Sequence, residues 1–326
     1  MRRYPGFLAR VERRTEILQL TRSQIQSAVE HVLPRTTVTA HRLADQGRAN
    51  TNYIVETDRG SYVLRVYVRE GEACAKERAI HELMDGRVPV AKIWGSGDAQ
   101  QGLGHPFSVL DFVPGVSLEA LAARGERAPL LNAARALGAI LAELTSFRFD
   151  QFADLRADST GKLHTVAWSF GDFYRSCLFE SPAAARLGPL RDRLWALLQR
   201  QQGRFSDPLP IHLTHGDFNP TNVLVRDDGQ VAAVLDWEFA HAGKVWHDLG
   251  NLLRERPELT LPNGFEAALA DGFSERGLHL PPDWRAHAEF DDLNSACDFL
   301  SSVEEKPETH ARALRQISRL LERYAG

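Results

Sequence analysis

The chain of 326 residues is 43% hydrophobic and carries 43 acidic against 39 basic side chains, for a formal charge of −4. These values exclude a collagen-like or wholly disordered chain and argue against a dedicated nucleic-acid binder, which would be strongly basic. The chain has no run of about 18 apolar residues and no C-x-x-C pair among its three cysteines, so we expect no membrane span and a reducing, cytoplasmic location.

The first third of the chain predicts an arm, a helix and a small sheet. Residues 1–20 are basic and weakly periodic, which predicts a surface arm. Thr21 is a suitable cap for a helix whose apolar residues recur at i, i+3, i+4 and i+7 from Ile25. Asp58-Arg59-Gly60 predicts a hairpin turn. The elements expected around it are strands over 36–43, 52–57, 61–68, 91–94 and 106–112 and a helix over 70–85.

Val113-Pro114-Gly115 interrupts this pattern, and the rest of the chain is expected to be mainly helical. A heptad-spaced stripe from Leu130 to Leu144 predicts a buried helix face, and a further helical region is expected over 166–201. Asp227-Asp228-Gly229 predicts a second hairpin, after which helices resume near 247. We therefore divide the chain into an N-terminal arm and helix (1–35), a nucleotide-binding lobe (36–112) and a lobe for catalysis and acceptor binding (113–326).

The strongest chemical signal is the segment His215-Gly216-Asp217-Phe218-Asn219-Pro220-Thr221-Asn222, followed fourteen residues after Asn222 by Asp236. A hairpin that starts at Asn222 brings its two ends together, so Asn222 and Asp236 should face each other. A carboxylate beside an amide oxygen suits Mg²⁺, which prefers oxygen ligands. Asp217 lies a few residues away, where it can accept a proton or orient a hydroxyl. This is the minimum set for metal-assisted phosphoryl transfer.

The spacing H-x-D-x-x-x-x-N followed by Asp236-Trp237-Glu238 is typical of kinase catalytic segments. With His-Gly-Asp and Asp-Trp-Glu at these positions, the chain closely resembles the aminoglycoside phosphotransferase and choline kinase-like family of small-molecule kinases. The resemblance covers about 36–255. It implies a two-lobed α+β protein kinase-like fold, with a small antiparallel-sheet lobe that carries one main helix and a larger, mainly helical lobe.

The resemblance also assigns roles in the small lobe. Arg65, in Tyr62-Val63-Leu64-Arg65-Val66, matches the strand cation that binds the α- and β-phosphates of the nucleotide, and Glu77 matches the helix glutamate that pairs with it. The backbone groups of Asp111 and Val113 match the hinge that faces the adenine edge. The loop over 46–51 lies where a phosphate-covering loop is expected.

The function implied is transfer of the γ-phosphoryl group of ATP, with GTP less favoured, to a hydroxyl of a small molecule. Asp217 would orient and deprotonate that hydroxyl, while Asn222 and Asp236 would hold Mg²⁺. The acceptor stays open among aminoglycosides, other antibiotics, choline-like alcohols, amino alcohols and sugars. Two alternatives are a catalytically silent nucleotide-binding regulator and a protein kinase; no Ala-Pro-Glu-like anchor follows Asp236, which disfavours the latter. The oligomeric state is not indicated.

Two further features bear on the site. His215 is expected to tie the catalytic loop by hydrogen bonds, and His241, His247 and Asp248 are interpreted as loop or helix anchors rather than zinc ligands. The segment 283–308 holds eight acids and two bases. We interpret it first as an amphipathic helix with a solvated polar face. The alternative is an anionic wall that would attract a cationic acceptor.

Overall fold

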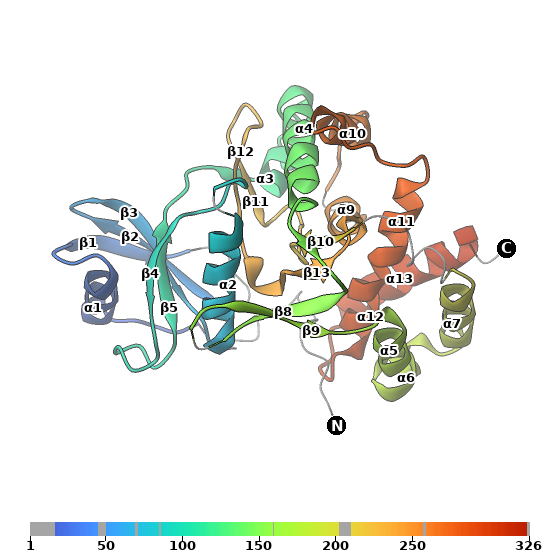
Figure 1. Cartoon of the computed structure of the whole chain (residues 1–326), viewed down its shortest axis with the longest axis horizontal. Helices are drawn as coiled ribbons and strands as arrows, with labels where there is room; N and C mark the ends of the chain where they lie inside the picture. The colour runs from blue at the N-terminus through green and yellow to red at the C-terminus, as the bar shows by residue number, and fades with distance from the viewer. Residues whose placement is uncertain are drawn as a thin grey trace.

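The computed structural model describes residues 17–44, 50–68, 71–84, 86–158, 160–201, 210–256 and 259–324. Figure 1 shows a β-rich part built from the N-terminal elements and a larger helical part built from the C-terminal ones. Across the described ranges, no helix is both long and apolar enough to cross a membrane. Most of the expected arm over 1–20 and of the expected phosphate-covering loop over 46–51 lies outside the described residues.

The β-rich part is a five-stranded antiparallel sheet with strand order β1-β2-β3-β5-β4. Its strands are β1 (Val38–Leu43), β2 (Thr51–Thr57), β3 (Gly60–Val66), β4 (Ile93–Gly97) and β5 (Phe107–Asp111). Gly60 completes the β2–β3 turn with φ +129°, a backbone conformation that L side chains rarely adopt. The hairpin expected at this point is therefore confirmed.

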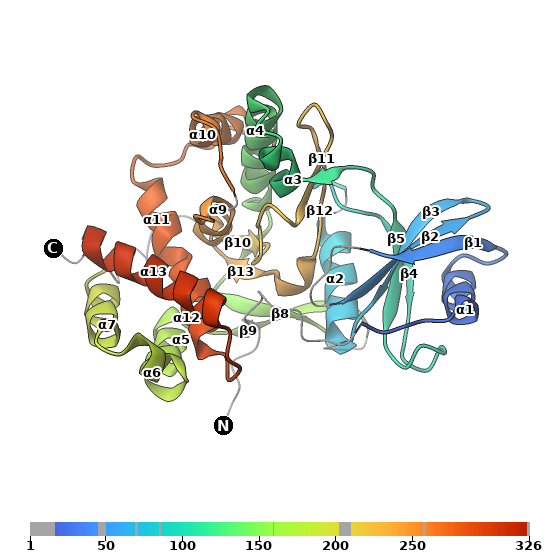
Figure 2. The same ribbon diagram turned by 180° about the vertical axis from the view of Figure 1, so that it is seen from behind.

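Two helices lie on opposite sides of this sheet (Figure 1). Helix α1 (Arg22–Val32) begins at Thr21, whose side chain accepts a hydrogen bond from the Gln24 N–H in a capping box, and its apolar face packs on the sheet. Helix α2 (Gly71–Met84) lies between the sheet and the helical part in both Figures 1 and 2. Its Ile80 and Met84 belong to the main core of the helical part. Helix α2 is thus held between the two parts.

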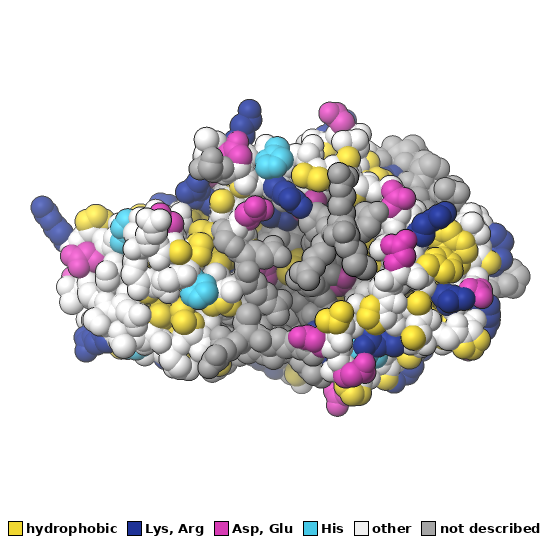
Figure 3. Space-filling model, turned by 90° about the horizontal axis from the view of Figure 1, so that it is seen from below, with side chains coloured by type: hydrophobic (Ala, Val, Ile, Leu, Met, Phe, Trp, Pro, Cys, Tyr) yellow, Lys and Arg dark blue, Asp and Glu magenta, His cyan; other side chains and the backbone are white. Residues whose placement is uncertain are grey.

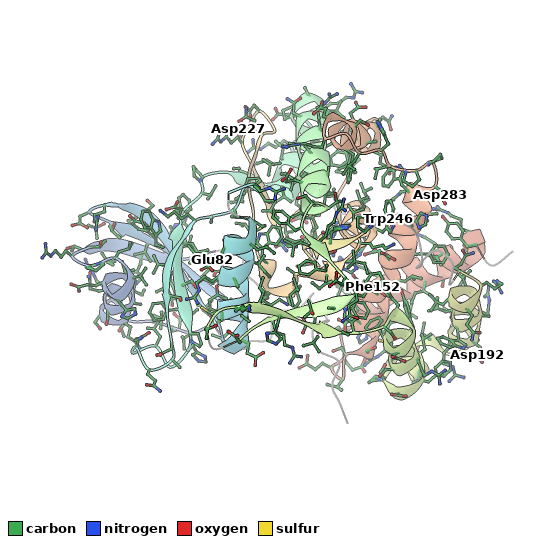
Figure 4. The ribbon with its side chains drawn as sticks, viewed as in Figure 1. Glu82, Phe152, Asp192, Asp227, Trp246 and Asp283 are labelled. Atoms are coloured by element: carbon green, nitrogen blue, oxygen red, sulfur yellow. The ribbon has the colours of Figure 1, made fainter. Side chains whose placement is uncertain are left out.

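The chain crosses between the two parts after Asp111. Strand β6 (Val116–Ser117) pairs with β11 (Val223–Val225), which also pairs with β12 (Val231–Val234). The expected turn lies between β11 and β12, with Gly229 at φ +87°, and Figure 4 places Asp227 at its tip. The crossing lies next to the expected boundary between 112 and 113. The division of the chain into 1–35, 36–112 and 113–326 stays a prediction.

A second five-stranded antiparallel sheet, of order β7-β10-β13-β8-β9, lies within the helical part. Its strands are β7 (Arg148–Phe149), β8 (Ala153–Ala157), β9 (Leu163–Ala167), β10 (Ile211–Thr214) and β13 (His241–Gly243). The helical region expected over 166–201 is wrong at its start, because residues 163–167 form β9. Ala153 and Leu155 of β8 are buried in the core, and this burial favours an extended chain here over a helix.

The remaining helices surround this sheet. They are α3 (Leu118–Ala123), α4 (Arg127–Leu144), α5 (Phe170–Arg175), a π-helical turn (Ser176–Glu180), α6 (Ala183–Leu187), α7 (Leu190–Arg200), α9 (Val245–Leu253), α10 (Phe265–Glu275), α11 (Trp284–Asp291), α12 (Leu293–Ser301) and α13 (Pro307–Tyr324). The leucine stripe of α4 is buried, as expected. Trp246 of α9, labelled in Figure 4, stacks on His287 of α11 with ring centroids 5.1 Å apart.

The expectation of a solvated polar face over 283–308 is wrong. The segment breaks into α11 and α12, and its polar residues Asp291, Asn294 and Ser295 are buried. Asp292, at the break, receives hydrogen bonds from Arg254 and from Gln316 of α13. Asp292 is buried because partners from other helices satisfy its carboxylate there.

The surface carries charges of both signs. In the view of Figure 3, acidic and basic side chains of the described residues are interspersed. Arg135, for example, pairs with Asp271 at 3.1 Å and with Glu275 at 2.6 Å. The three cysteines, Cys74, Cys177 and Cys297, are free and buried.

Candidate active site

The segment 215–222 leaves β10 as a loop that is fastened from behind by Asp248 of α9. The backbone N–H of His215 donates to Oδ2 of Asp248 at 2.8 Å, and that of Gly216 donates to Oδ1 at 3.0 Å. Asp248 is 1% exposed. Burial raises the pKa of this carboxyl to about 7, although the two backbone hydrogen bonds act in the opposite direction. The interpretation of Asp248 as a loop anchor is confirmed.

His215 and His247 hold the same loop from either side. The N–H of Asp217 donates to Nδ1 of His215 at 3.1 Å, so Nε2 carries the proton of the neutral ring and donates to the Leu235 carbonyl at 2.9 Å. Nε2 of His247 lies 3.2 Å from the Gly216 carbonyl oxygen. Burial lowers the pKa of His247. His215 therefore ties the loop to the end of β12, as expected.

Asp217 presents a half-buried carboxylate whose two oxygens are each held by an amide. The side chain of Asn219 donates to Oδ1 and that of Asn222 to Oδ2, both at 2.8 Å. Asn222 also donates to the Asp217 carbonyl at 2.9 Å. The carboxylate is consequently fixed in one orientation by residues of its own loop.

The hairpin brings Asn222 and Asp236 to the same end; that their side chains face each other stays a prediction. Val223 pairs with Val234, and the Leu235 N–H donates to the Asn222 carbonyl at 2.8 Å. Asp236 follows in the left-handed conformation, at φ +70°. Its side chain turns to the β-rich part, whereas the Asn222 amide turns to Asp217.

Arg65 of β3 joins Asp236 to Glu77 of α2. Its Nη2 lies 2.6 Å from Oδ1 of Asp236, and its Nε lies 3.2 Å from Oε2 of Glu77. Burial alone would lower the pKa of Arg65, but the charges of Glu77 and Asp236 outweigh it and hold the pKa well above its ordinary value. Glu77 also accepts from the hydroxyl of Tyr67 at 2.5 Å and from the Trp237 N–H at 3.2 Å. The network thus connects the sheet, α2 and the corner after β12.

A cavity of about 390 Å³ lies over this network and brings together five of the seven residues that the sequence singles out: Arg65, Glu77, Asp111, Val113 and Asp236. The Asp111 N–H is bonded to the Lys92 carbonyl at 2.9 Å. Within the described part of the chain, the Val113 N–H has no hydrogen-bond partner. Apolar side chains such as Val63, Leu110 and Leu224 complete the walls, so the cavity suits a flat ring with a charged end.

A second cavity, of about 320 Å³, opens beside Asp217 and Asn219 and is lined by α9, α11 and α13. Arginines dominate it, and sequence reasoning missed them because they come from three separate helices. The anionic wall expected from 283–308 is not what this cavity presents. Of the acids of that segment, only Glu289 and Asp292 line it, and both are paired, with Arg323 and Arg254 respectively.

The fold is that of a phosphotransferase family of small-molecule kinase type. A model of the phosphotransferase enzyme family matches residues 41–290, more than three quarters of the chain. The chain belongs to this family, and the resemblance drawn from its motifs is confirmed.

Solved structures share the two-lobed kinase-like fold at low sequence identity. The aminoglycoside phosphotransferase APH(4)-Ia aligns over 94% of this chain and 100% of its own, with a TM-score of 0.67 and 18% identity. A thermostable mutant of it in ternary complex with AMP-PNP and hygromycin B gives a TM-score of 0.68 at 18% identity, over 93% and 99% of the two chains. Choline kinase LicA from Streptococcus pneumoniae gives 0.63 at 14% identity, over 93% and 99%.

Curated relatives of similar sequence are named homoserine kinases. That of Caulobacter vibrioides (strain NA1000 / CB15N) is 28% identical over 205 residues, or 60% of this chain and 58% of the relative. That of Gluconobacter oxydans (strain 621H) is 27% identical over 250 residues, or 73% of each chain. The match thus spans less than two thirds of the length of the first of these relatives.

Proposed function

We propose that this chain transfers the γ-phosphoryl group of ATP to a hydroxyl group of a small molecule. The observation that carries the proposal is the position of Asp217. Two amides hold its carboxylate at the edge of the 320 Å³ cavity. The same loop leads through Asn222 into the hairpin that ends at Asp236, and Asp236 lines the 390 Å³ cavity. A base beside an acceptor cavity, joined to a phosphate cavity, is the arrangement that phosphoryl transfer requires.

The nucleotide would occupy the 390 Å³ cavity. The carbonyl of Asp111 and the N–H of Val113, which has no partner among the described residues, suit the hydrogen-bonding edge of adenine, and they favour ATP over GTP as the donor. Arg65 would bind the α- and β-phosphates, for which a guanidinium offers paired donors. Glu77 would keep Arg65 in place, because its carboxylate contacts Nε and is itself held by Tyr67 and Trp237.

The ends of the hairpin fit Mg²⁺. Asp236 supplies a carboxylate and Asn222 an amide oxygen, since its amide nitrogen is the atom that donates to Asp217. Both are hard oxygen ligands of the kind that this ion takes. When bound, the ion would neutralise charge on the phosphate oxygens. Arg65 would then exchange its contact with Asp236 for contacts with phosphate.

Asp217 would orient the acceptor hydroxyl and take its proton. Its carboxylate is half-buried and lines the acceptor cavity, so a bound hydroxyl can reach it. Because the fold does not fix the acceptor, homoserine, choline and aminoglycosides are all compounds to test. A reaction that consumes ATP is consistent with a cytoplasmic location.

The test is release of ADP from Mg²⁺–ATP in the presence of each acceptor, with Asp217→Asn as the blank. We expect the wild type to turn over one acceptor class, and we expect Asp217→Asn to release ADP about 10²–10⁴-fold more slowly. Tight ATP binding, with no increase in ADP release when any acceptor is added, would favour the catalytically silent regulator instead. Absence of ATP and GTP binding would contradict the proposal.

A further inference from the structure

Two arginines at the end of α9, Arg254 and Arg256, line the cavity beside Asp217 but have different surroundings. Nε of Arg254 donates to both oxygens of Asp292, at 3.1 and 2.8 Å, and Gln316 donates to the same carboxylate at 2.7 Å. The charge of Arg254 is therefore compensated within the protein.

Arg256 lacks such compensation. Its Nη2 donates to the Asn251 carbonyl at 3.2 Å, and its Nη1 is buried without a hydrogen-bond partner in the described part of the chain. Nor do the described residues place any carboxylate in an ion pair with it. Burial and the neighbouring charge of Arg254 together lower the pKa of Arg256 to about 10. A buried guanidinium nitrogen with an unused donor is unfavourable unless an acceptor such as a carboxylate completes it.

The cavity as a whole is also positive. Its lining holds seven arginines and five carboxylates, a difference of two positive charges. Three of the carboxylates are already tied to arginines: Asp292 to Arg254, Glu255 to Arg319 and Glu289 to Arg323. A polycationic acceptor such as an aminoglycoside would meet this excess of positive charge at close range, whereas an acceptor with a carboxylate would meet opposite charge.

We infer that the acceptor carries a carboxylate and that Arg256 binds it, which makes the substrate a hydroxy acid or a hydroxy amino acid. This inference rests on the proposed function and names the substrate class of its acceptor cavity. Guanidinium and carboxylate match each other through two parallel hydrogen bonds. Asp217 lies in the same cavity and would face the hydroxyl, and Glu119, also in its lining, would accept an ammonium group. Homoserine has all three groups.

The first experiment measures binding without nucleotide. Calorimetric titrations compare L-homoserine, L-serine and 4-hydroxybutyrate with their neutral carboxamides, for the wild type, Arg256→Met and Arg256→Lys. We expect the wild type to bind at least one acid about 10- to 100-fold more tightly than its amide, the value of a hydrogen bond to a charged group. Arg256→Met should abolish that preference and Arg256→Lys should restore part of it. Equal binding of every acid and its amide, or binding of none, overturns the inference.

A matched control variant and a stability measurement test whether the role of Arg256 is only structural. Arg124→Met removes one positive charge outside both cavities and should keep the preference, because Arg124 is paired with Asp227 at the surface. Arg256→Met removes a half-buried cation that has no ion-pair partner among the described residues, so its Tm should equal or exceed that of the wild type. A large fall in Tm would assign Arg256 to the fold and overturn the inference.

The second experiment separates this inference from the proposed function. ADP release from Mg²⁺–ATP is measured with the same acids, with their amides and with hygromycin B. Turnover of hygromycin B or of the amides at the rate of the acids leaves the kinase proposal intact and overturns the acceptor class. A preference for acids in binding without any turnover retains the acceptor class and contradicts the kinase proposal.

Discussion

Nη2 of Arg65 lies 2.6 Å from Oδ1 of Asp236, across 171 positions of the chain. The same guanidinium lies 3.2 Å from Glu77, so one cation stands between two carboxylates from different elements. These two contacts fix the positions of β3, α2 and the corner after β12 relative to one another. It also means that a ligand competing for Arg65 would release Asp236.

Arg65→Met should destabilise the protein strongly. It would leave Glu77, which is 2% exposed at its side chain, without its cation in the interior. Removing one partner of a buried ion pair typically costs about 3–5 kcal/mol of unfolding free energy. Urea titration monitored by tryptophan fluorescence measures the loss. Arg65→Lys should lose less, since it keeps the charge but not both contacts. Unchanged stability of Arg65→Met would contradict the role given to this network.

Asp217→Asn should lower kcat by about 10²–10⁴-fold while ATP binding stays unchanged. Tm should fall slightly, because the new amide nitrogen faces one of the two amides that donate to the carboxylate. The substitution keeps the shape of the side chain but removes the group that takes the proton. Steady-state kinetics with the best acceptor and a nucleotide titration measure the two effects. Retention of wild-type kcat would show that another group performs the proton transfer.

Gly216→Ala should reduce both stability and activity. Gly216 has φ +82°, and a Cβ there would lie 2.2 Å from the Phe239 carbonyl oxygen. The backbone conformation alone costs an alanine about 1–3 kcal/mol, and the clash would displace Asp217, the next residue. Gly171→Ala in α5 is the control, because its Cβ would meet nothing within 4 Å. Equal melting temperatures and equal kcat for the two variants would refute this expectation.

Stability should depend on the protonation of buried histidines. Burial lowers the pKa of His247 and holds that of His241 well below its ordinary value. Below about pH 6.5 these two histidines therefore bind protons in the unfolded chain but not in the folded chain. The free energy of unfolding that the two neutral histidines contribute is consequently lost as the pH falls. Asp248, with its pKa raised to about 7, contributes in the opposite sense, since the folded state holds its proton up to that pH.

His247→Gln isolates the histidine contribution, because Asp248 is common to both proteins. Unfolding free energies at about pH 7.5 and about pH 5.5 should fall less on acidification in the variant than in the wild type. The glutamine amide can still donate to the Gly216 carbonyl, the partner of His247. An equal or steeper fall in the variant would mean that His247 is not the titrating group.

The elements that the sequence predicted correctly are those with local signals. Thr21 and Gln24 form the capping box of α1, and Gly60 and Gly229 mark turns that require positive φ. The family was also recognised from local signals, because the spacing of Asp217, Asn222 and Asp236 lies within one short segment; the catalytic roles of these three residues stay predictions. By contrast, the β8–β9 hairpin was missed, although Gly161 at φ +85° marks its turn.

Features that depend on distant partners could not be predicted. The acids of 283–308 appeared to belong on a solvated face, because no local pattern shows that Asp292 meets Arg254 and Gln316. In the same way, nothing near Arg256 in the sequence distinguishes it from the paired Arg254. The charge of the acceptor cavity emerges only when α9, α11 and α13 come together.

The short strand β6 has a consequence for recombining this enzyme with its relatives. Val116 and Ser117 pair with Val225 and Leu224 of β11, so they belong to the sheet of the β11–β12 hairpin although they directly follow the crossing from the β-rich part. A chimera that takes its β-rich part from another family member should therefore be joined between Asp111 and Val116. A junction after Ser117 would pair a foreign strand with the native hairpin and misplace Asn222 and Asp236 together.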